Sequence, residues 1–139
     1  MNTKGKGTNA ERQLLHMFWQ HNWAAVRVAG SGSMKYDCPD LLVGHDKTKL
    51  AIECKVTSSD YQYFSKHEIF SLRSFSHLFG AEAYVAIKFN KRNWFFLKVQ
   101  NLKETTNNYV VSKNLADESG ITFEMILEEN KGLMLSSKK

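Results

Sequence analysis

The stretch PDLLVGHDKTKLAIECKV, residues 39–56, decides the fold of this 139-residue chain. Two runs, 40–44 and 49–56, flank the polar segment 45–48, which is the pattern of a β-hairpin. In the second run Glu53 and Lys55 share one face of the strand with Ala51. The opposite face is apolar and should pack on a core; it carries Leu50, Ile52, Cys54 and Val56.

The register of this hairpin predicts a metal site. If Gly44 pairs with Lys49 across a four-residue turn, Asp40 lies directly opposite Glu53, with Cβ atoms about 4.5–5.5 Å apart. Two carboxylates so close repel each other unless one is protonated or a divalent cation lies between them. Such oxygen ligands suit Mg²⁺, for which Mn²⁺ can substitute. The backbone carbonyl of Cys54 is a candidate third ligand.

Lys55 is the candidate catalytic lysine of this site. An ammonium beside the ion can position the attacking water or offset charge on a phosphate in the transition state. The Cys54 thiol should point into the core, so we do not expect a nucleophilic cysteine. The alternative for this pattern is an ordinary surface hairpin stabilised by salt bridges.

The flanking sequence predicts an α/β fold of one domain, in which helices flank a mixed central β-sheet. Helices are expected over 10–22, 66–79 and 122–130, and further strands over 23–29, 82–89, 94–99 and 109–111. Asn9 and Thr122 are the expected N-caps, and Gly80 closes the middle helix. Residues 1–9 should form a flexible basic arm and residues 131–139 a loose tail.

Composition favours a nucleic-acid partner. Nineteen Lys and Arg against fourteen Asp and Glu give a net charge of +5, which suits a polyanion but also serves solubility alone. Two cysteines are too few for a disulfide framework or a four-cysteine zinc site. No apolar run approaches the length of a membrane span or a secretory signal. We therefore expect a cytoplasmic, DNA-associated protein with no membrane partner.

The chain resembles the archaeal Holliday junction resolvases of the PD-(D/E)xK nuclease superfamily. The resemblance covers about residues 4–100, and its blocks occur in family order: Ala10–Arg12, Ala25–Ser33, Pro39–Leu42, Ile52–Lys55, Phe75–Gly80 and Val85–Phe89. It implies a restriction-endonuclease-like fold and a homodimer. It also implies a Mg²⁺-dependent endonuclease that resolves four-way DNA junctions in recombination and repair, leaving 5′-phosphate and 3′-hydroxyl ends.

The resemblance also assigns roles to individual residues. Glu11 joins Asp40 and Glu53 as an acidic metal-site residue, and Lys55 matches the catalytic lysine. Arg12 and Arg27 match residues that contact DNA, and Ser31 or Ser33 matches a loop serine close to the scissile phosphate. Phe75 and Phe79 match aromatic residues of the dimer or junction contact. The basic residues of the arm and loop are further candidate DNA contacts: Lys4, Lys6 and Lys35.

Several of these assignments have structural alternatives. Glu11 would also favour the helix dipole, and Arg12 could lie along the helix surface beside Trp19. Phe75 and Phe79, one turn apart, are equally consistent with a core or an interface. Ser31 and Ser33 could be ordinary loop residues. The five histidines show no ligand spacing, and we interpret them as structural or solvated.

Two rival functions remain open at this level. The first is a sequence-specific restriction-type or repair nuclease on the same core, against which the short chain argues. The second is a non-catalytic DNA-binding dimer, against which the intact Asp40, Glu53 and Lys55 argue.

Overall fold

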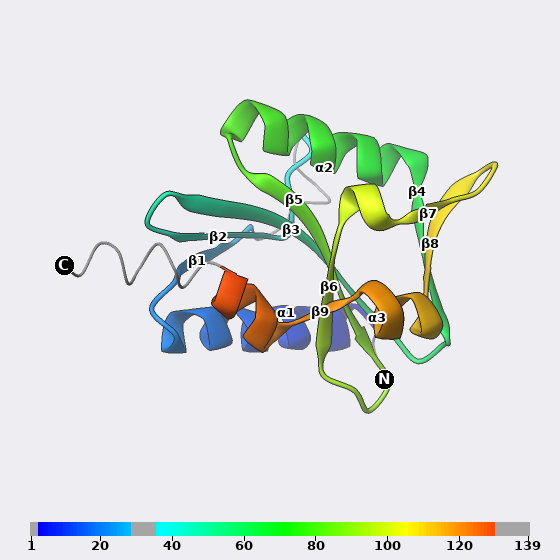
Figure 1. Ribbon diagram of the computed structural model, residues 1–139, viewed down its shortest axis with the longest axis horizontal. Coiled ribbons are helices and arrows are strands. Elements are labelled where there is room, and N and C mark those ends of the chain that lie inside the picture. The colour runs from blue at the N-terminus through cyan, green and yellow to red at the C-terminus, as the bar shows by residue number, and fades with distance from the viewer. Residues whose placement is uncertain (1–2, 29–35, 130–139) are drawn as a thin grey trace.

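A mixed six-stranded sheet lies between two long helices (Figure 1). The computed structural model describes residues 3–28 and 36–129, with side chains from residue 7 onward. The strand order is β1-β2-β3-β5-β6-β9, in which β3 and β5 are parallel and the other neighbours antiparallel. The strands are β1 (Ala24–Arg27), β2 (Leu41–His45), β3 (Thr48–Thr57), β5 (Glu82–Phe89), β6 (Trp94–Lys98) and β9 (Ile121–Thr122). The α/β fold with a mixed central sheet is therefore confirmed.

The hairpin of β2 and β3 has the register that the sequence predicts. Gly44 pairs with Lys49 and Leu41 with Ile52. The turn is shorter than expected, because His45 pairs with Thr48 and only residues 46 and 47 remain between the strands. Asp46 adopts a positive φ of 54°, a conformation that aspartate tolerates better than most residues because its side chain can bond locally.

Each face of the sheet is covered by a long helix, and β3 is packed against a core on both sides. Helix α1 (Thr3–Gln20) covers one face, and α2 (Lys66–Phe79) covers the other (Figure 1). Ile52 and Cys54 belong to the core on the α1 side. Ala51, and with it the face that carries Glu53 and Lys55, belongs to the α2 side. The prediction that the Cys54 thiol points into a core is confirmed, since this residue is 6% exposed.

Helix α2 has the bounds that the sequence predicts. Ser65 and Glu68 form a capping box, in which each side chain accepts from the other residue's backbone N–H. At the other end Gly80 has φ 83°, and its N–H donates to the carbonyl oxygen of Ser76. A glycine is favoured there because the left-handed conformation costs it little.

The prediction of a loose arm over residues 1–9 is wrong for residues 3–9, which belong to α1. Asn9 is accordingly inside the helix and is not its N-cap. Once the buried turns around Ala10 and Leu14 are formed, each added residue contributes a hydrogen bond at little further cost, so the helix continues through Gly7 and Gly5. The expected tail at 131–139 lies outside the described residues.

A second, small antiparallel sheet was not predicted. It has the order β4-β8-β7, made of Tyr61–Ser65, Asn108–Ser112 and Lys103–Glu104. A 3₁₀ turn, η2 (Val99–Asn101), and a short helix, α3 (Lys113–Ser119), were also missed.

The C-terminal helix begins where the sequence predicts. Residues 123–129 are helical, and the hydroxyl of Thr122 accepts from the backbone N–H of Met125 over 3.1 Å. None of the helices in the described part of the chain is both long and apolar enough to span a membrane.

Candidate active site

Asp40 immediately precedes β2 and is fixed to the strand opposite. Its carboxylate Oδ2 accepts from the backbone N–H of Cys54 over 2.8 Å, and its carbonyl oxygen accepts from the N–H of Val28 over 2.9 Å. Burial raises the pKa of Asp40, although the hydrogen bond from Cys54 and the charge of Lys55 act in the opposite direction. The side chain is thus a partly buried carboxylate that a hydrogen bond holds beside β3.

Glu53 lies on β3 beside this carboxylate. Burial, together with the negative charge of Asp40, raises the pKa of Glu53 to about 8. Two neighbouring acids in one poorly solvated place cannot both ionise easily. A cation bound between them would remove this penalty, which is the behaviour expected of a metal site.

The raised pKa of Glu53 has a measurable consequence for stability. The folded protein binds more protons than the unfolded chain between about pH 4.5 and 8, so the free energy of unfolding falls as pH rises through this window. We expect Glu53→Gln to stabilise the metal-free protein by on the order of 2 kcal/mol at pH 8, with the difference vanishing near pH 4. Urea unfolding in EDTA at both pH values measures this.

The matched control for that measurement is Glu82→Gln, since Glu82 is exposed at the start of β5. It should change the unfolding free energy little at either pH. If Glu53→Gln changed the free energy of unfolding equally at both pH values, the Glu53 carboxylate would ionise as easily in the folded protein as in the unfolded chain. That result would contradict the raised pKa of Glu53.

Lys55 follows on the same face of β3 and contacts the first turn of α2. Its Nζ lies 2.9 Å from Oε2 of Glu68 and 5.9 Å from the ring centre of Phe64. Burial lowers the pKa of Lys55, but the hydrogen bond and charge of Glu68 outweigh it and raise the pKa overall. The ammonium is therefore charged and held at the edge of the acidic site.

Glu11 reaches the same region from α1. Its Oε1 accepts from Nε of Arg27 over 3.1 Å, and both side chains are about one-fifth exposed, at 19% and 21%. Burial raises the pKa of Glu11, and the charge of Asp40 raises it further. The charge of Asp40 thus acts on Glu11, and the role of Glu11 as a metal-site residue stays a prediction.

The donor chemistry of the site suits a hard divalent cation. Among the described residues no group of three or more His, Cys, Asp or Glu side chains is gathered closely enough to hold an ion. Two of the acids instead form ion pairs with basic side chains, Glu11 with Arg27 and Glu68 with Lys55. Asp40 and Glu53 remain, and Mg²⁺ commonly uses one or two carboxylates and completes its shell with water.

Other candidate residues lie outside this cluster. Arg12 is exposed on α1. Phe75 is half-buried and stacks on Phe79, with ring centres 5.4 Å apart, so the pair spans the edge of the core and the surface. Ser31, Ser33 and Lys35, and the side chains of Lys4 and Lys6, fall outside what the structure describes.

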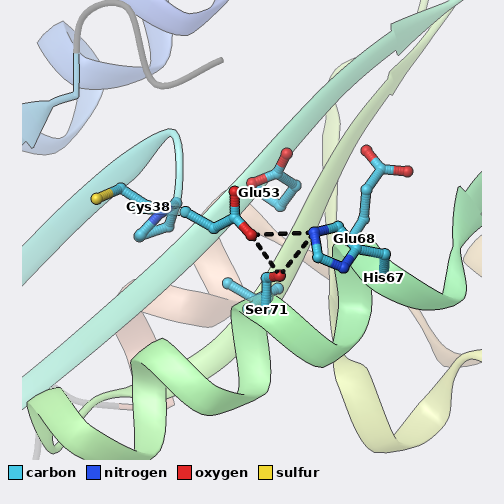
Figure 2. Close-up of a pocket in the computed structure, with 8 residues that line it drawn as sticks. Cys38, Glu53, His67, Glu68 and Ser71 are labelled. Atoms are coloured by element: carbon cyan, nitrogen blue, oxygen red, sulfur yellow. Dashed lines mark hydrogen bonds and ion pairs between the residues drawn. The ribbon is translucent and has the colours of Figure 1, made fainter. Parts of the chain in front are cut away.

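Sequence reasoning missed the contribution of α2. Figure 2 shows His67, Glu68 and Ser71 projecting from this helix into a pocket that Glu53 also lines. Asp37, three residues before Asp40, accepts hydrogen bonds from the hydroxyl of Ser71 and pairs with Nε2 of His67, each over 3.0 Å. The Ser65 capping box was the one sequence signal that could have marked Glu68.

The turn between β5 and β6 adds basic side chains at the same end of the sheet. Lys55 pairs in register with Ile87, close to the end of β5, and the turn follows at residues 90–93. Lys88, Lys91 and Arg92 line a hollow there together with Gln13 of α1. These side chains add positive charge at this end of the sheet, which suits contact with a polyanion, although Arg92 itself pairs with Asp117.

Comparison with known proteins agrees with this arrangement. The family described as archaeal Holliday junction resolvase (Hjc) matches residues 2–134. The crossover junction endodeoxyribonuclease Hjc of Archaeoglobus fulgidus is 43% identical over 112 residues, 81% of this chain and 82% of the relative. The enzyme of the same name from Methanocaldococcus jannaschii is 34% identical over 110 residues, 79% and 78% of the two chains.

A solved structure extends the similarity to the fold. The structure of Archaeoglobus fulgidus Hjc, described as a Holliday junction resolvase from an archaeal hyperthermophile, superposes with a TM-score of 0.78 at 38% identity. The match covers 87% of this chain and 94% of the other.

A mixed sheet in which Asp40 immediately precedes β2, and Glu53 and Lys55 lie on the neighbouring strand β3, is typical of the PD-(D/E)xK class of nuclease folds. Within this class the chain belongs to the archaeal Holliday junction resolvase family.

Proposed function

We propose that this protein is a structure-selective endonuclease that resolves four-way DNA junctions by metal-dependent phosphodiester hydrolysis, in DNA recombination and repair. The observation that carries the proposal is the partly buried pair of Asp40 and Glu53 beside the charged Lys55. Relatives that share the fold and at least a third of the sequence are named crossover junction endodeoxyribonucleases.

The residues divide the chemistry among themselves. Asp40, Glu53 and the backbone carbonyl of Cys54 would hold Mg²⁺, or Mn²⁺ in its place, and Glu11, which pairs with Arg27 in this structure, is a further candidate ligand. A bound ion of this kind acidifies a water ligand and stabilises charge on the phosphate. Lys55 directs its ammonium at the reacting phosphate or the water. Water attacks phosphorus and the bond to the 3′ oxygen breaks, which leaves 5′-phosphate and 3′-hydroxyl ends.

DNA binding is assigned to the basic residues around the site. Arg12 is exposed on α1, next in sequence to Glu11, and Arg27 borders the acids. Arginine suits phosphate because its planar group donates two parallel hydrogen bonds. The candidate contacts Lys4, Lys6 and Lys35, and the loop serines Ser31 and Ser33, remain predictions. Contacts to phosphates read the shape of the junction and not its sequence.

A homodimer is part of the proposal. One chain carries one site, whereas resolving a junction takes two symmetric cuts, which a two-fold dimer supplies at a fixed separation. Helix α2 offers a surface for it, because Phe70, Leu78 and Phe79 are 69%, 88% and 45% exposed. Large exposed apolar side chains on one helix are candidates for a protein interface.

Cleavage of matched DNAs tests this function. With Mg²⁺ the protein should make paired cuts in a four-way junction and leave a linear duplex of the same sequence intact, and EDTA should stop cleavage. Binding should favour the junction, and affinity for both DNAs should fall steeply with salt as phosphate contacts release counterions. Light scattering should give twice the mass of one 16.0 kDa chain.

The rivals give different results in the same assay. A restriction-type nuclease would cut the linear duplex at a defined sequence. A non-catalytic binding dimer would hold the junction without cutting it in any metal. Equal affinity for junction and duplex at moderate salt would contradict structure selectivity.

A further inference from the structure

Glu68 contacts two parts of the molecule through its two carboxylate oxygens. Oε1 accepts from the backbone N–H of Ser65 over 2.8 Å and so closes the capping box of α2. Oε2 lies 2.9 Å from Nζ of Lys55. We propose that Glu68 is a positioning residue that orients the Lys55 ammonium for DNA cleavage; this inference rests on the function proposed above.

Lys55 needs such a partner because a lysine side chain is flexible. Its four-carbon stem has many rotamers, and an ammonium acts as a point charge with no preferred plane. The side chain is 32% exposed, so packing alone does not fix it, and the Phe64 ring contacts it from one side at 5.9 Å. Asp40 and Glu53 attract the charge, but Glu68 makes the hydrogen bond that sets its direction.

Glu68 is itself held in place by the start of the helix. Its own backbone N–H donates to the Ser65 hydroxyl over 3.0 Å, and its carboxylate returns the bond to the Ser65 N–H. A carboxylate fixed at both ends of its side chain has little freedom left. The first turn of α2 therefore holds the Glu68 carboxylate in one orientation. Figure 2 shows Glu68 on the same side of this helix as Glu53.

A purely structural role for Glu68 would not need its charge. A capping box is satisfied by Gln as well as by Glu, since only one side-chain oxygen is required. In Glu68→Gln that oxygen can still accept from Ser65, but the amide group that replaces Oε2 cannot accept from an ammonium. The substitution thus keeps the cap and removes the bond to Lys55.

The first test is single-turnover cleavage of a four-way junction at saturating enzyme. We expect Glu68→Gln to cut about 10- to 100-fold more slowly, as a misplaced catalytic group does, with unchanged junction affinity. Glu68→Asp, which restores the charge, should recover part of the rate. Ser112→Ala removes the N-cap of α3, far from this contact along the chain, and should lower stability without slowing cleavage.

A double substitution identifies the group through which Glu68 acts. In a Lys55→Ala background, Glu68→Gln should slow cleavage less than about twofold, because two residues that act as one unit are not additive. An equal loss in both backgrounds would overturn the inference and would point to Glu68 as an independent group, such as a metal ligand.

A second measurement needs neither metal nor DNA. With ¹³C-labelled lysine, the two Hε protons of a held Lys55 should have separate signals, which should merge in Glu68→Gln and stay separate in Ser112→Ala. Failure of the wild-type chain to cut a junction would refute the proposed function. A wild-type chain that cuts, with Glu68→Gln equally fast, would refute the role of Glu68 alone.

Discussion

Asp40→Asn is expected to abolish cleavage of the four-way junction, by about 10³-fold or more, while junction binding stays intact or becomes tighter. The carboxylate is half of the partly buried pair that would hold the cation, and without the cation there is no activated water and no counter-charge on the phosphate. Glu53→Gln should behave alike. Affinity does not fall, because a negative charge close to the DNA backbone has been removed.

The structure shows why this loss should not reflect unfolding. In Asp40→Asn the amide oxygen can still accept from the Cys54 N–H, where Oδ2 now does so over 2.8 Å. The matched control is Asp46→Asn in the hairpin turn, at the other end of the same two strands, where asparagine also tolerates positive φ. Substantial Mg²⁺-dependent cleavage by Asp40→Asn or Glu53→Gln would refute the proposed site.

Lys55→Ala is expected to slow the chemical step by about 10²–10³-fold, the usual cost of losing one well-placed transition-state charge, and to change junction affinity little. Single-turnover cleavage at saturating enzyme isolates this effect, since saturation hides a pure binding defect. Lys47→Ala, in the turn of the same hairpin, is the control for removing a lysine. A wild-type rate for Lys55→Ala under saturation would show that its assigned role is wrong.

Arg12→Ala should have the complementary effect. Arg12 is exposed and lies outside the contacts among the acids, so its loss should lower affinity and reduce the salt slope by about one unit, with little change in the saturated rate. Arg27→Ala should lower both affinity and rate, because its guanidinium also partners the half-buried Glu11, and an acid left unpaired alters the charge balance of the site.

The hairpin was predictable because polar and apolar residues alternate along its second strand, and this pattern is compatible with a single pairing register. A slip by one residue would turn Glu53 and Lys55 into the apolar core in place of Cys54, at a prohibitive cost. The bounds of α2 were predictable for a similar reason, since Gly80 marks its end. Both features depend on neighbours close in sequence, and the structure agrees with the sequence there.

The missed features depend on contacts between distant segments. Strand β4 pairs with β8, more than forty residues later in the chain, and its short Tyr61–Ser65 run carries no pattern that requires a strand. The sequence analysis did not single out Glu68, whose contact with Lys55 exists because α2 packs against β3. The start of α1 was predicted too late in the chain because Gly5 and Gly7 have low helix propensity. The helix extends through them because the buried turns that follow already nucleate it.

The burial of β3 on both faces constrains how this enzyme can diverge. Cys54 packs toward α1 while its neighbours Glu53 and Lys55 point toward α2, and Asp40 is bonded to the Cys54 backbone itself. A bulkier side chain at this position would shift the backbone that carries the acids. We therefore expect that substitutions which repack the core on the α1 side to raise thermal stability also change the cleavage rate, unless compensating substitutions accompany them. Thermal stability and turnover would then not evolve independently.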